Sequence, residues 1–302
     1  MRYLTPLRYP GGKAKLASFV RAVVSTNGLT NGHYVEPYAG GAGIACALLV
    51  GNDVAHIHVN DLDRSIYAFW HSVLNETDRL CRRIRDVRLS IEEWRRQRAI
   101  QSRPDNVSLL DLGFSALFLN RTNRSGIICS GGVIGGIDQS GKWKLDARFP
   151  RDGLITRIQT IAAYRHQITL YNCDAAILLR TLLPRLPAKS LLYLDPPYYV
   201  KGNRRLYANV YEHADHAEIA KILSRARCSW LVSYDDVPQI RALYRRRRRR
   251  LYSLTYTARD RYQGAEIVFS SDDLVLPSIR NPLKIAQRIR GRDGLREPRK
   301  HL

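Results

Sequence analysis

Residues 33–61 read HYVEPYAGGAGIACALLVGNDVAHIHVND, and the order of the elements in them predicts the fold class. The pattern of residues predicts a strand over His33–Glu36, the glycines that follow predict a turn, and Ile44–Val50 predicts an apolar helix. A second strand, His56–Val59, ends at Asn60 and Asp61. Strand, glycine turn, helix and a second strand with an acidic end are typical of a nucleotide-binding, Rossmann-like α/β sheet.

The same alternation returns later in the chain, after an interruption. Apolar runs predict strands over 168–171, 191–194, 230–233 and 266–269, with a helix over 219–223. Residues 71–165 break the pattern, because a helical, arginine-rich stretch leads into a polar, glycine-rich loop over 120–141. We therefore predict a discontinuous catalytic domain over 1–70 and 166–280, an inserted, mainly helical domain over 71–165, and a basic, mobile tail over 281–302.

The charge of the chain indicates a polyanionic partner. Its 302 residues carry 49 Lys and Arg against 27 Asp and Glu, a formal net charge of +22, so nucleic acid is the first partner to consider. The longest apolar run is far shorter than the roughly 20 residues of a membrane-spanning helix, which predicts a soluble protein with no membrane partner. Five scattered cysteines and the lack of an N-terminal secretory signal favour a reducing cytoplasm, and no metal-binding spacing is present.

Two features of the first half predict contacts with a nucleotide-like ligand. The glycine turn that follows Glu36 opens a helix, so its backbone can approach a ligand closely while the helix N-terminus supplies oriented NH groups. Asp61, at the end of the second strand, stands where an acid accepts hydrogen bonds from a ribose diol. Each feature has a structural alternative, because any α/β protein uses such turns, and an acid here can cap the next helix, although Asp63 is better placed for that.

Asp195-Pro196-Pro197-Tyr198 is the most specific signal, and it follows the apolar run 191–194 directly. The amino nitrogen of a nucleobase is a poor nucleophile because its lone pair is delocalised into the ring. A carboxylate and a backbone carbonyl, fixed in direction by the prolines, can hold the amino group and turn that lone pair toward a methyl donor. Tyr198 offers a ring on which a flipped base can stack. The structural alternative is a proline turn that closes a strand.

Taken together, these motifs resemble those of the Dam-type DNA adenine methyltransferases over about residues 7–270. The resemblance implies S-adenosylmethionine as the cofactor, double-stranded DNA as the substrate, and methyl transfer to the exocyclic amino group of a flipped adenine at a specific site. It also implies a cytoplasmic, DNA-associated protein of bacterial or phage origin that can have a restriction endonuclease partner.

Site residues carry over from the family position by position. Asp195, Pro196, Pro197 and Tyr198 correspond to the catalytic motif. The residues implied in cofactor binding are Tyr9, Lys13, Glu36, Gly40, Asp61, Asp174 and Asp195. The residues implied in nucleic-acid binding lie in the predicted insert and are Asn120, Arg121, Asn123 and Arg124. Residues 231–235 resemble a later strand-end motif with a lesser role.

The chain departs from the family pattern at two places, and other classes stay open. Ala42 stands where many members have a third glycine, with Gly43 after it, which leaves the register of the loop open by one residue. The run Arg245–Arg250 is foreign to the family and fits either a solvated loop or strand edge, or an arm that contacts phosphates. The alternatives are a cytosine amino methyltransferase, which favours Ser over Asp at position 195, an RNA or protein methyltransferase, and a catalytically silent DNA-binding relative.

Overall fold

The computed structural model describes residues 4–8, 13–199, 211–256 and 262–277. The expectations for Tyr9 and for the tail 281–302 lie outside these residues. Within the described part of the chain, no helix combines the length and the apolar character that crossing a bilayer requires.

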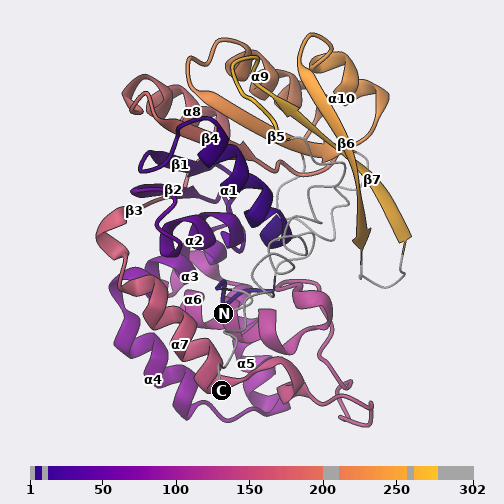
Figure 1. The fold of residues 1–302 in the computed structure, drawn as a ribbon. Coiled ribbons are helices and arrows are strands. Elements are labelled where there is room, and N and C mark those ends of the chain that lie inside the picture. Colours follow the sequence, from indigo (N-terminus) through magenta and orange to yellow (C-terminus); the bar gives the residue numbers. More distant parts are fainter. Residues whose placement is uncertain (1–3, 9–12, 200–210, 257–261, 278–302) are drawn as a thin grey trace, which may run out of the picture.

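A seven-stranded mixed sheet forms the centre of the α/β fold, with the strand order β3-β2-β1-β4-β5-β7-β6 (Figure 1). The first five strands pair in parallel, whereas β7 is antiparallel to both β5 and β6. Because the parallel strands end at the same edge, the segments that follow them gather there. The strands are β1 (His33–Glu36), β2 (His56–Asn60), β3 (Ile168–Tyr171), β4 (Ser190–Leu194), β5 (Ser229–Asp235), β6 (Arg248–Tyr256) and β7 (Tyr262–Ser270).

Helices cover both faces of the sheet because successive strand residues point to opposite sides. Tyr34 and Ile57 pack into one apolar cluster with α1 (Ala17–Thr26), α2 (Gly43–Val50) and α3 (Arg64–Asn75). Val35 and Leu192 pack on the other face against α8 (Ala175–Leu182), α9 (His213–Ser224) and α10 (Pro238–Leu243). The short 3-10 helix η1 (Lys13–Leu16) leads into α1.

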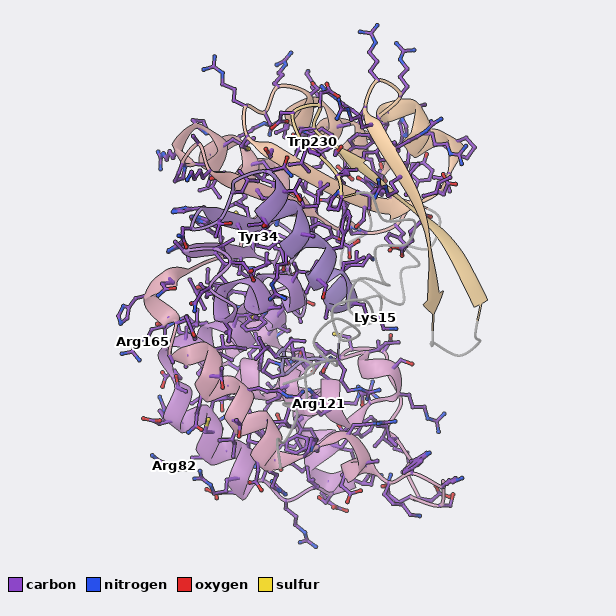
Figure 2. The ribbon with its side chains drawn as sticks, viewed as in Figure 1. Lys15, Tyr34, Arg82, Arg121, Arg165 and Trp230 are labelled. Carbon is purple, nitrogen blue, oxygen red and sulfur yellow. The ribbon has the colours of Figure 1, made fainter. Side chains whose placement is uncertain are left out.

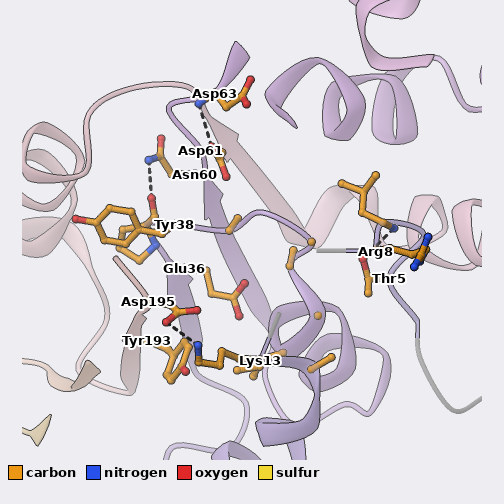
Figure 3. Close-up of a pocket in the computed structure, with 18 of the residues that line it drawn as sticks. Thr5, Arg8, Lys13, Glu36, Tyr38, Asn60, Asp61, Asp63, Tyr193 and Asp195 are labelled. Carbon is orange, nitrogen blue, oxygen red and sulfur yellow. Dashed lines mark hydrogen bonds and ion pairs between the residues drawn. The ribbon is translucent and has the colours of Figure 1, made fainter. Parts of the chain in front are cut away.

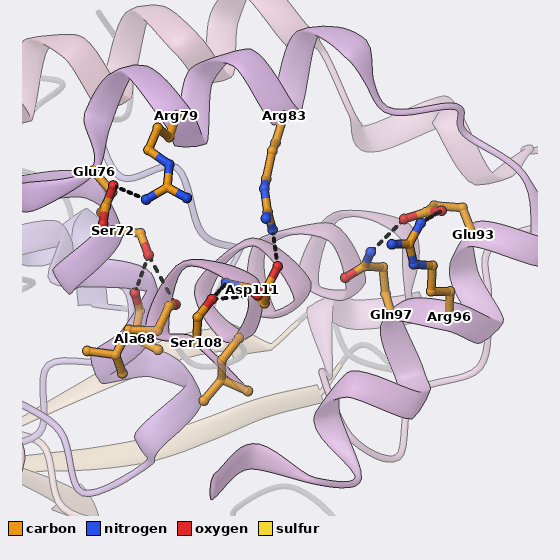
Figure 4. A network of polar contacts seen from close by, with 12 residues as sticks. Ala68, Ser72, Glu76, Arg79, Arg83, Glu93, Arg96, Gln97, Ser108 and Asp111 are labelled. Carbon is orange, nitrogen blue, oxygen red and sulfur yellow. Dashed lines mark hydrogen bonds and ion pairs between the residues drawn. The ribbon is translucent and has the colours of Figure 1, made fainter. Parts of the chain in front are cut away.

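Four helices occupy the chain between α3 and β3, and Figure 1 shows them gathered below the sheet. They are α4 (Thr77–Asp86), α5 (Ile91–Gln101), α6 (Leu109–Thr122) and α7 (Arg151–Ala162), with single 3-10 turns between and beyond them. Polar contacts tie α3 to α6, for example from Ser72 Oγ to Leu109 O at 3.2 Å, and Arg83 of α4 pairs with Asp111 of α6 at 2.5 Å (Figure 4). Apolar residues of α4, α6 and α7 belong to the same cluster as α1 and α2. The helical region therefore shares a continuous core with the sheet.

Most expected elements are confirmed, including the strands at 33–36, 168–171, 191–194 and 230–233. One expectation is corrected. The loop expected from Asn120 begins later, because α6 continues through Thr122. For the arginine run, the alternative of a strand edge holds from Arg248 on, because residues 248–256 form the edge strand β6, which reaches beyond the run. The predicted domain boundary at residue 70 lies inside α3.

Candidate active site

A cavity of about 540 Å³ lies at the sheet edge where β1, β2 and β4 end (Figure 3). Its wall brings together residues that are far apart in the sequence: Glu36 after β1, Asp61 after β2, and Asp195 after β4, with Lys13 from η1. The sequence motifs on three strands therefore meet in one space. The rest of the wall includes Leu7, Tyr38, Gly41, Ala42, Gly43, Asn60, Tyr193, Pro197 and Tyr211.

Ala42 and Gly43 have different structural roles in the loop between β1 and α2. Ala42 adopts the left-handed conformation, with φ +43°, and stands at the N-cap of α2. Gly43 is required for packing, because a Cβ at this position would lie 2.8 Å from the Cβ of Ala14 in η1. Since Gly41, Ala42 and Gly43 line the cavity, the N-terminus of α2 faces it.

Glu36 is a buried carboxylate in the wall of the cavity. Its Oε1 accepts hydrogen bonds from the Tyr34 hydroxyl at 3.0 Å and from the Ala45 backbone NH at 3.1 Å. Burial nevertheless dominates and raises the pKa of Glu36 to about 8. The side chain is therefore mostly protonated at neutral pH.

Asp61 is fixed by the backbone of two loops. Its Oδ2 accepts from Gly40 NH at 2.8 Å, and its Oδ1 accepts from Asp63 NH at 2.9 Å. Burial, and secondarily the charge of Asp63, raises the pKa of Asp61 to about 7. Asp63 itself caps α3 by accepting from Ser65 NH at 2.8 Å. Capping is therefore performed by Asp63, while Asp61 faces the cavity.

Asp195 is held between a cation and a hydroxyl. Its Oδ1 lies 3.1 Å from Lys13 Nζ and accepts a hydrogen bond from Ser233 Oγ of β5 at 2.8 Å. The Asp195 side chain keeps 22% of its surface exposed, whereas that of Lys13 keeps 4%. Ser233 lies in the segment 231–235, for which the family resemblance implies a lesser role, and its hydroxyl contacts the Asp195 carboxylate directly.

Glu266 of β7 is a site residue that the sequence motifs did not identify. This carboxylate is fully buried, lies 3.6 Å from Lys13 Nζ and accepts a short hydrogen bond from the Tyr198 hydroxyl. Lys13 Nζ also donates to the Tyr198 hydroxyl at 2.5 Å and lies 4.9 Å from the centre of its ring. The available signal was an acid at the head of the apolar run 266–269, which predicts a buried charge that needs a partner.

Two other residues expected to bind the cofactor, Gly40 and Asp174, make hydrogen bonds within the protein instead of lining the cavity. The backbone NH of Gly40 is used by Asp61, and Trp70 Nε1 donates to Gly40 O at 2.9 Å. Asp174 caps α8 by accepting from Ala176 NH at 2.8 Å, and it does not line the cavity although Ala175 does. Pro196 and Tyr198 lie behind the cavity wall, whereas Pro197 forms part of it.

The four residues expected to contact nucleic acid divide into two groups. Asn120 and Asn123 are fully buried and hold the backbone: Asn120 bonds to the NH and carbonyl of Arg8 at 2.7 and 2.8 Å, and Asn123 accepts from Trp94 Nε1 at 2.7 Å. Arg121 is also buried, but it lines the cavity, and Arg124 alone of the four is exposed.

Four arginines line one part of the cavity: Arg8, Arg121, Arg148 and Arg157. Burial, followed by the charges of the other three, lowers the pKa of Arg121 to about 9. Arg121 donates to Pro6 O, but its Nε and the Nη1 of Arg8 are buried without a hydrogen-bond partner in the part of the chain that the structure describes. Such uncompensated guanidinium groups are suited to an anionic ligand.

Comparison with known proteins identifies the family. A family model described as "D12 class N6 adenine-specific DNA methyltransferase" matches residues 9–258. No curated protein matches the chain. Among solved structures, a protein from Pyrococcus horikoshii described as an RNA methyltransferase is similar at 8% identity and a TM-score of 0.41, over 87% of this chain and 85% of that one. The rRNA methyltransferase AviRa from Streptomyces viridochromogenes gives 11% identity and a TM-score of 0.35, over 86% and 87% of the two chains. Both structural similarities are weak.

Proposed function

The chain belongs to the D12 class of N6 adenine-specific DNA methyltransferases, which use S-adenosylmethionine, and we propose that the cavity described above is where its two substrates meet. In this proposal the sheet is the Rossmann-like catalytic domain, the helical region over 71–165 reads the DNA, and the substrate is a flipped adenine in duplex DNA. The single observation that carries the proposal is the presence of Glu36, Asp61 and Asp195 in the wall of one cavity.

The residues around Asp61 fit the cofactor. The Asp61 carboxylate accepts one backbone NH on each oxygen, which orients it and leaves lone pairs for a ribose diol. The adjacent N-terminus of α2 and the loop over 41–43 let backbone approach the ligand closely. When bound, S-adenosylmethionine supplies an electrophilic methyl group on a sulfonium.

Asp195 is the acceptor for the adenine amino group. A carboxylate beside that nitrogen orients its lone pair and stabilises the positive charge that develops as the nitrogen gains a methyl group. Ser233 fixes the direction of the carboxylate from β5, and the exposed part of Asp195 faces the cavity. The nitrogen then returns to neutrality by releasing one of its protons.

Lys13 lies between Asp195 and the buried Glu266. Its ammonium lies 3.1 Å from Asp195 Oδ1 and 3.6 Å from the Glu266 carboxylate, so the two acids share Lys13. Through this shared contact Glu266 limits the pairing of Lys13 with Asp195, which keeps the Asp195 carboxylate available to the amino group. In this role Glu266 is a positioning residue, because it acts through Lys13 and Tyr198.

The arginines of the cavity and the insert are assigned to DNA. Arg121, with its unpartnered Nε, lies where the backbone of an extruded nucleotide would enter, and Arg148 is exposed beside it. Arg124, exposed on the turn after α6, is the candidate for a base or phosphate contact outside the cavity. Asn120 and Asn123 support this segment from inside.

Product identity tests the proposal. The purified chain is incubated with methyl-labelled S-adenosylmethionine and duplex DNA, and the digested nucleosides are separated. Label in N6-methyladenine supports the proposal. Label in N4-methylcytosine would assign the site to the cytosine amino methyltransferases, and label recovered only with RNA would reject duplex DNA as the substrate.

A further inference from the structure

The run Arg245–Arg250 lies at the end of the sheet that is opposite to the cavity. Arg248 pairs with Ser270, the last residue of β7, and Ser270 pairs with Leu231 near the start of β5. The run up to Arg248 therefore marks the edge where the parallel strands begin, whereas the cavity lies where they end. Figure 2 shows this separation, with Trp230 of β5 near the top of the molecule and Arg121 of the cavity below the sheet.

Arg247 fixes the run to a second arginine-bearing segment. Its guanidinium pairs with Asp272 at 2.5 Å, donates to Ser224 O at 3.3 Å and lies 5.9 Å from the centre of the Trp230 ring. Ser224 is the last residue of α9, so these contacts bring the turn after α9 alongside the run. We call the exposed arginines of the two segments the arginine surface: Arg225, Arg227, Arg245, Arg246, Arg248 and Arg249.

Ordinary structural roles account for only some of the six arginines of the arginine surface. Arg225 and Arg245 follow the C-termini of α9 and α10, where a cation is favoured by the helix dipole. Arg248 and Arg249 lie on the edge strand β6, where charge discourages pairing with another chain. None of these roles needs six cations together, and none of the six has an ion pair with another described residue. Of the two aspartates at this end, Asp272 pairs with Arg247, and Asp273 accepts from the Ser229 hydroxyl at 2.6 Å.

We propose that the arginine surface binds the phosphate backbone of a second segment of duplex DNA while the first segment occupies the cavity side. The two surfaces are separated by the length of the sheet, since β5 alone has seven residues and so spans roughly 20 Å. A duplex carries one negative charge per about 1.7 Å of its axis, which matches a dense set of exposed guanidinium groups. The inference rests on DNA being the substrate, because only a long substrate supplies a linked second segment at high effective concentration.

A capture experiment tests the inference with the full-length chain. A short duplex with target sites is tethered to beads and loaded with the protein, and a fluorescent duplex without target sites is then added. The parent should capture the second duplex in a strongly salt-dependent way. The variant R245Q/R246Q/R248Q/R249Q should capture at least about tenfold less, with a salt slope lower by roughly 3 to 4, since each lost phosphate contact removes about 0.9. Its methylation of a short duplex in solution should equal that of the parent.

A matched variant controls for net charge. Arg180, Arg185 and Lys189 are exposed and lie outside the arginine surface, the cavity wall and the helical region over 71–165, so R180Q/R185Q/K189Q removes three positive charges elsewhere and should still capture the second duplex. Equal losses in the two variants would overturn the inference, as would a parent that captures no second duplex. A parallel loss of short-duplex methylation would place these arginines on the first duplex and would also overturn it. Failure of the parent to methylate adenine would instead reject the proposed function.

Discussion

Lys13 Nζ lies 3.1 Å from Asp195 Oδ1, so the N-terminal motif and the motif after β4 meet in one ion pair at the wall of the cavity. The same ammonium lies 3.6 Å from the buried Glu266 carboxylate. In the proposed function Asp195 is the acceptor for the adenine amino group, so the pairing of Lys13 with Asp195 and with Glu266 determines how available the Asp195 carboxylate is to that group.

Because Lys13 contacts both Asp195 and Glu266, the effects of Glu266→Gln and Lys13→Met on the methylation rate should not add. In Glu266→Gln the ammonium of Lys13 pairs with Asp195 alone and competes with the amino group, so the single-turnover rate should fall about tenfold, the scale of one charged hydrogen bond. Adding Lys13→Met removes the competitor and should restore part of the rate at saturating cofactor. Losses that simply add in the double variant would show that Glu266 does not act through Lys13.

Asp61 predicts that cofactor affinity depends on pH. Its pKa near 7 belongs to the cofactor-free site, and the ionised form is the better acceptor for a ribose diol. The affinity for S-adenosylmethionine should therefore rise from pH 6 to pH 8. Calorimetry on Asp61→Asn should show weaker binding without this rise. An unchanged pH profile in the variant would remove Asp61 from the cofactor site.

Glu36 predicts a loss of stability at high pH. Its folded-state pKa of about 8 lies above the ordinary value of 4.5, so its contribution is fully present below pH 4.5 and is lost as the pH rises through 8. Glu36→Gln keeps an oxygen that can accept from Tyr34 and Ala45 but does not ionise. Urea unfolding should show that the variant gains stability relative to the parent between pH 6 and pH 9. A constant difference across that range would contradict the raised pKa.

Arg124 and Asn123 should behave differently although they are neighbours. Arg124→Ala removes an exposed cation and should weaken DNA binding, or change its sequence preference, with the free energy of unfolding unchanged. Asn123→Ala leaves Trp94 Nε1 and two backbone carbonyls without their partner in the interior, and it should lower the free energy of unfolding by about 1 to 3 kcal/mol. Equal effects on stability would contradict the buried and exposed placements.

The sequence predicted those parts of the fold that local pattern determines. The bounds of the strands His33–Glu36 and Ile168–Tyr171 were correct to the residue, because turn residues mark their ends. Ile168–Tyr171, which the pattern predicted as buried, is only half-buried because β3 lies at the edge of the sheet. For Arg248–Arg250 a strand edge was only one of the alternatives, because arginines give no apolar pattern and their pairing with β7 is set by tertiary contact at an open edge.

The sequence predicted the site residues that follow strands, but it did not predict the contacts between distant segments of the chain. Asp61 and Asp195 follow strands, and parallel topology brings such positions to one edge. The contact of Lys13 with Glu266 joins residues more than 250 positions apart, and no local pattern encodes it. The burial of Asn120 and Asn123 was likewise hidden, because polar residues near a helix end look the same in sequence whether they hold backbone or face DNA.

The rate of methyl transfer by Asp195→Ala tests the central claim most directly. Under single-turnover conditions, with cofactor and DNA binding confirmed to be intact, adenine methylation should fall by about a hundred- to a thousandfold, the usual cost of losing one preorganised group that stabilises the transition state. Asp195→Asn should be only partly better, because it keeps an acceptor but also presents an NH2 donor. Methylation of adenine by Asp195→Ala at nearly the parental rate would contradict the assignment of Asp195 as the acceptor for the amino group.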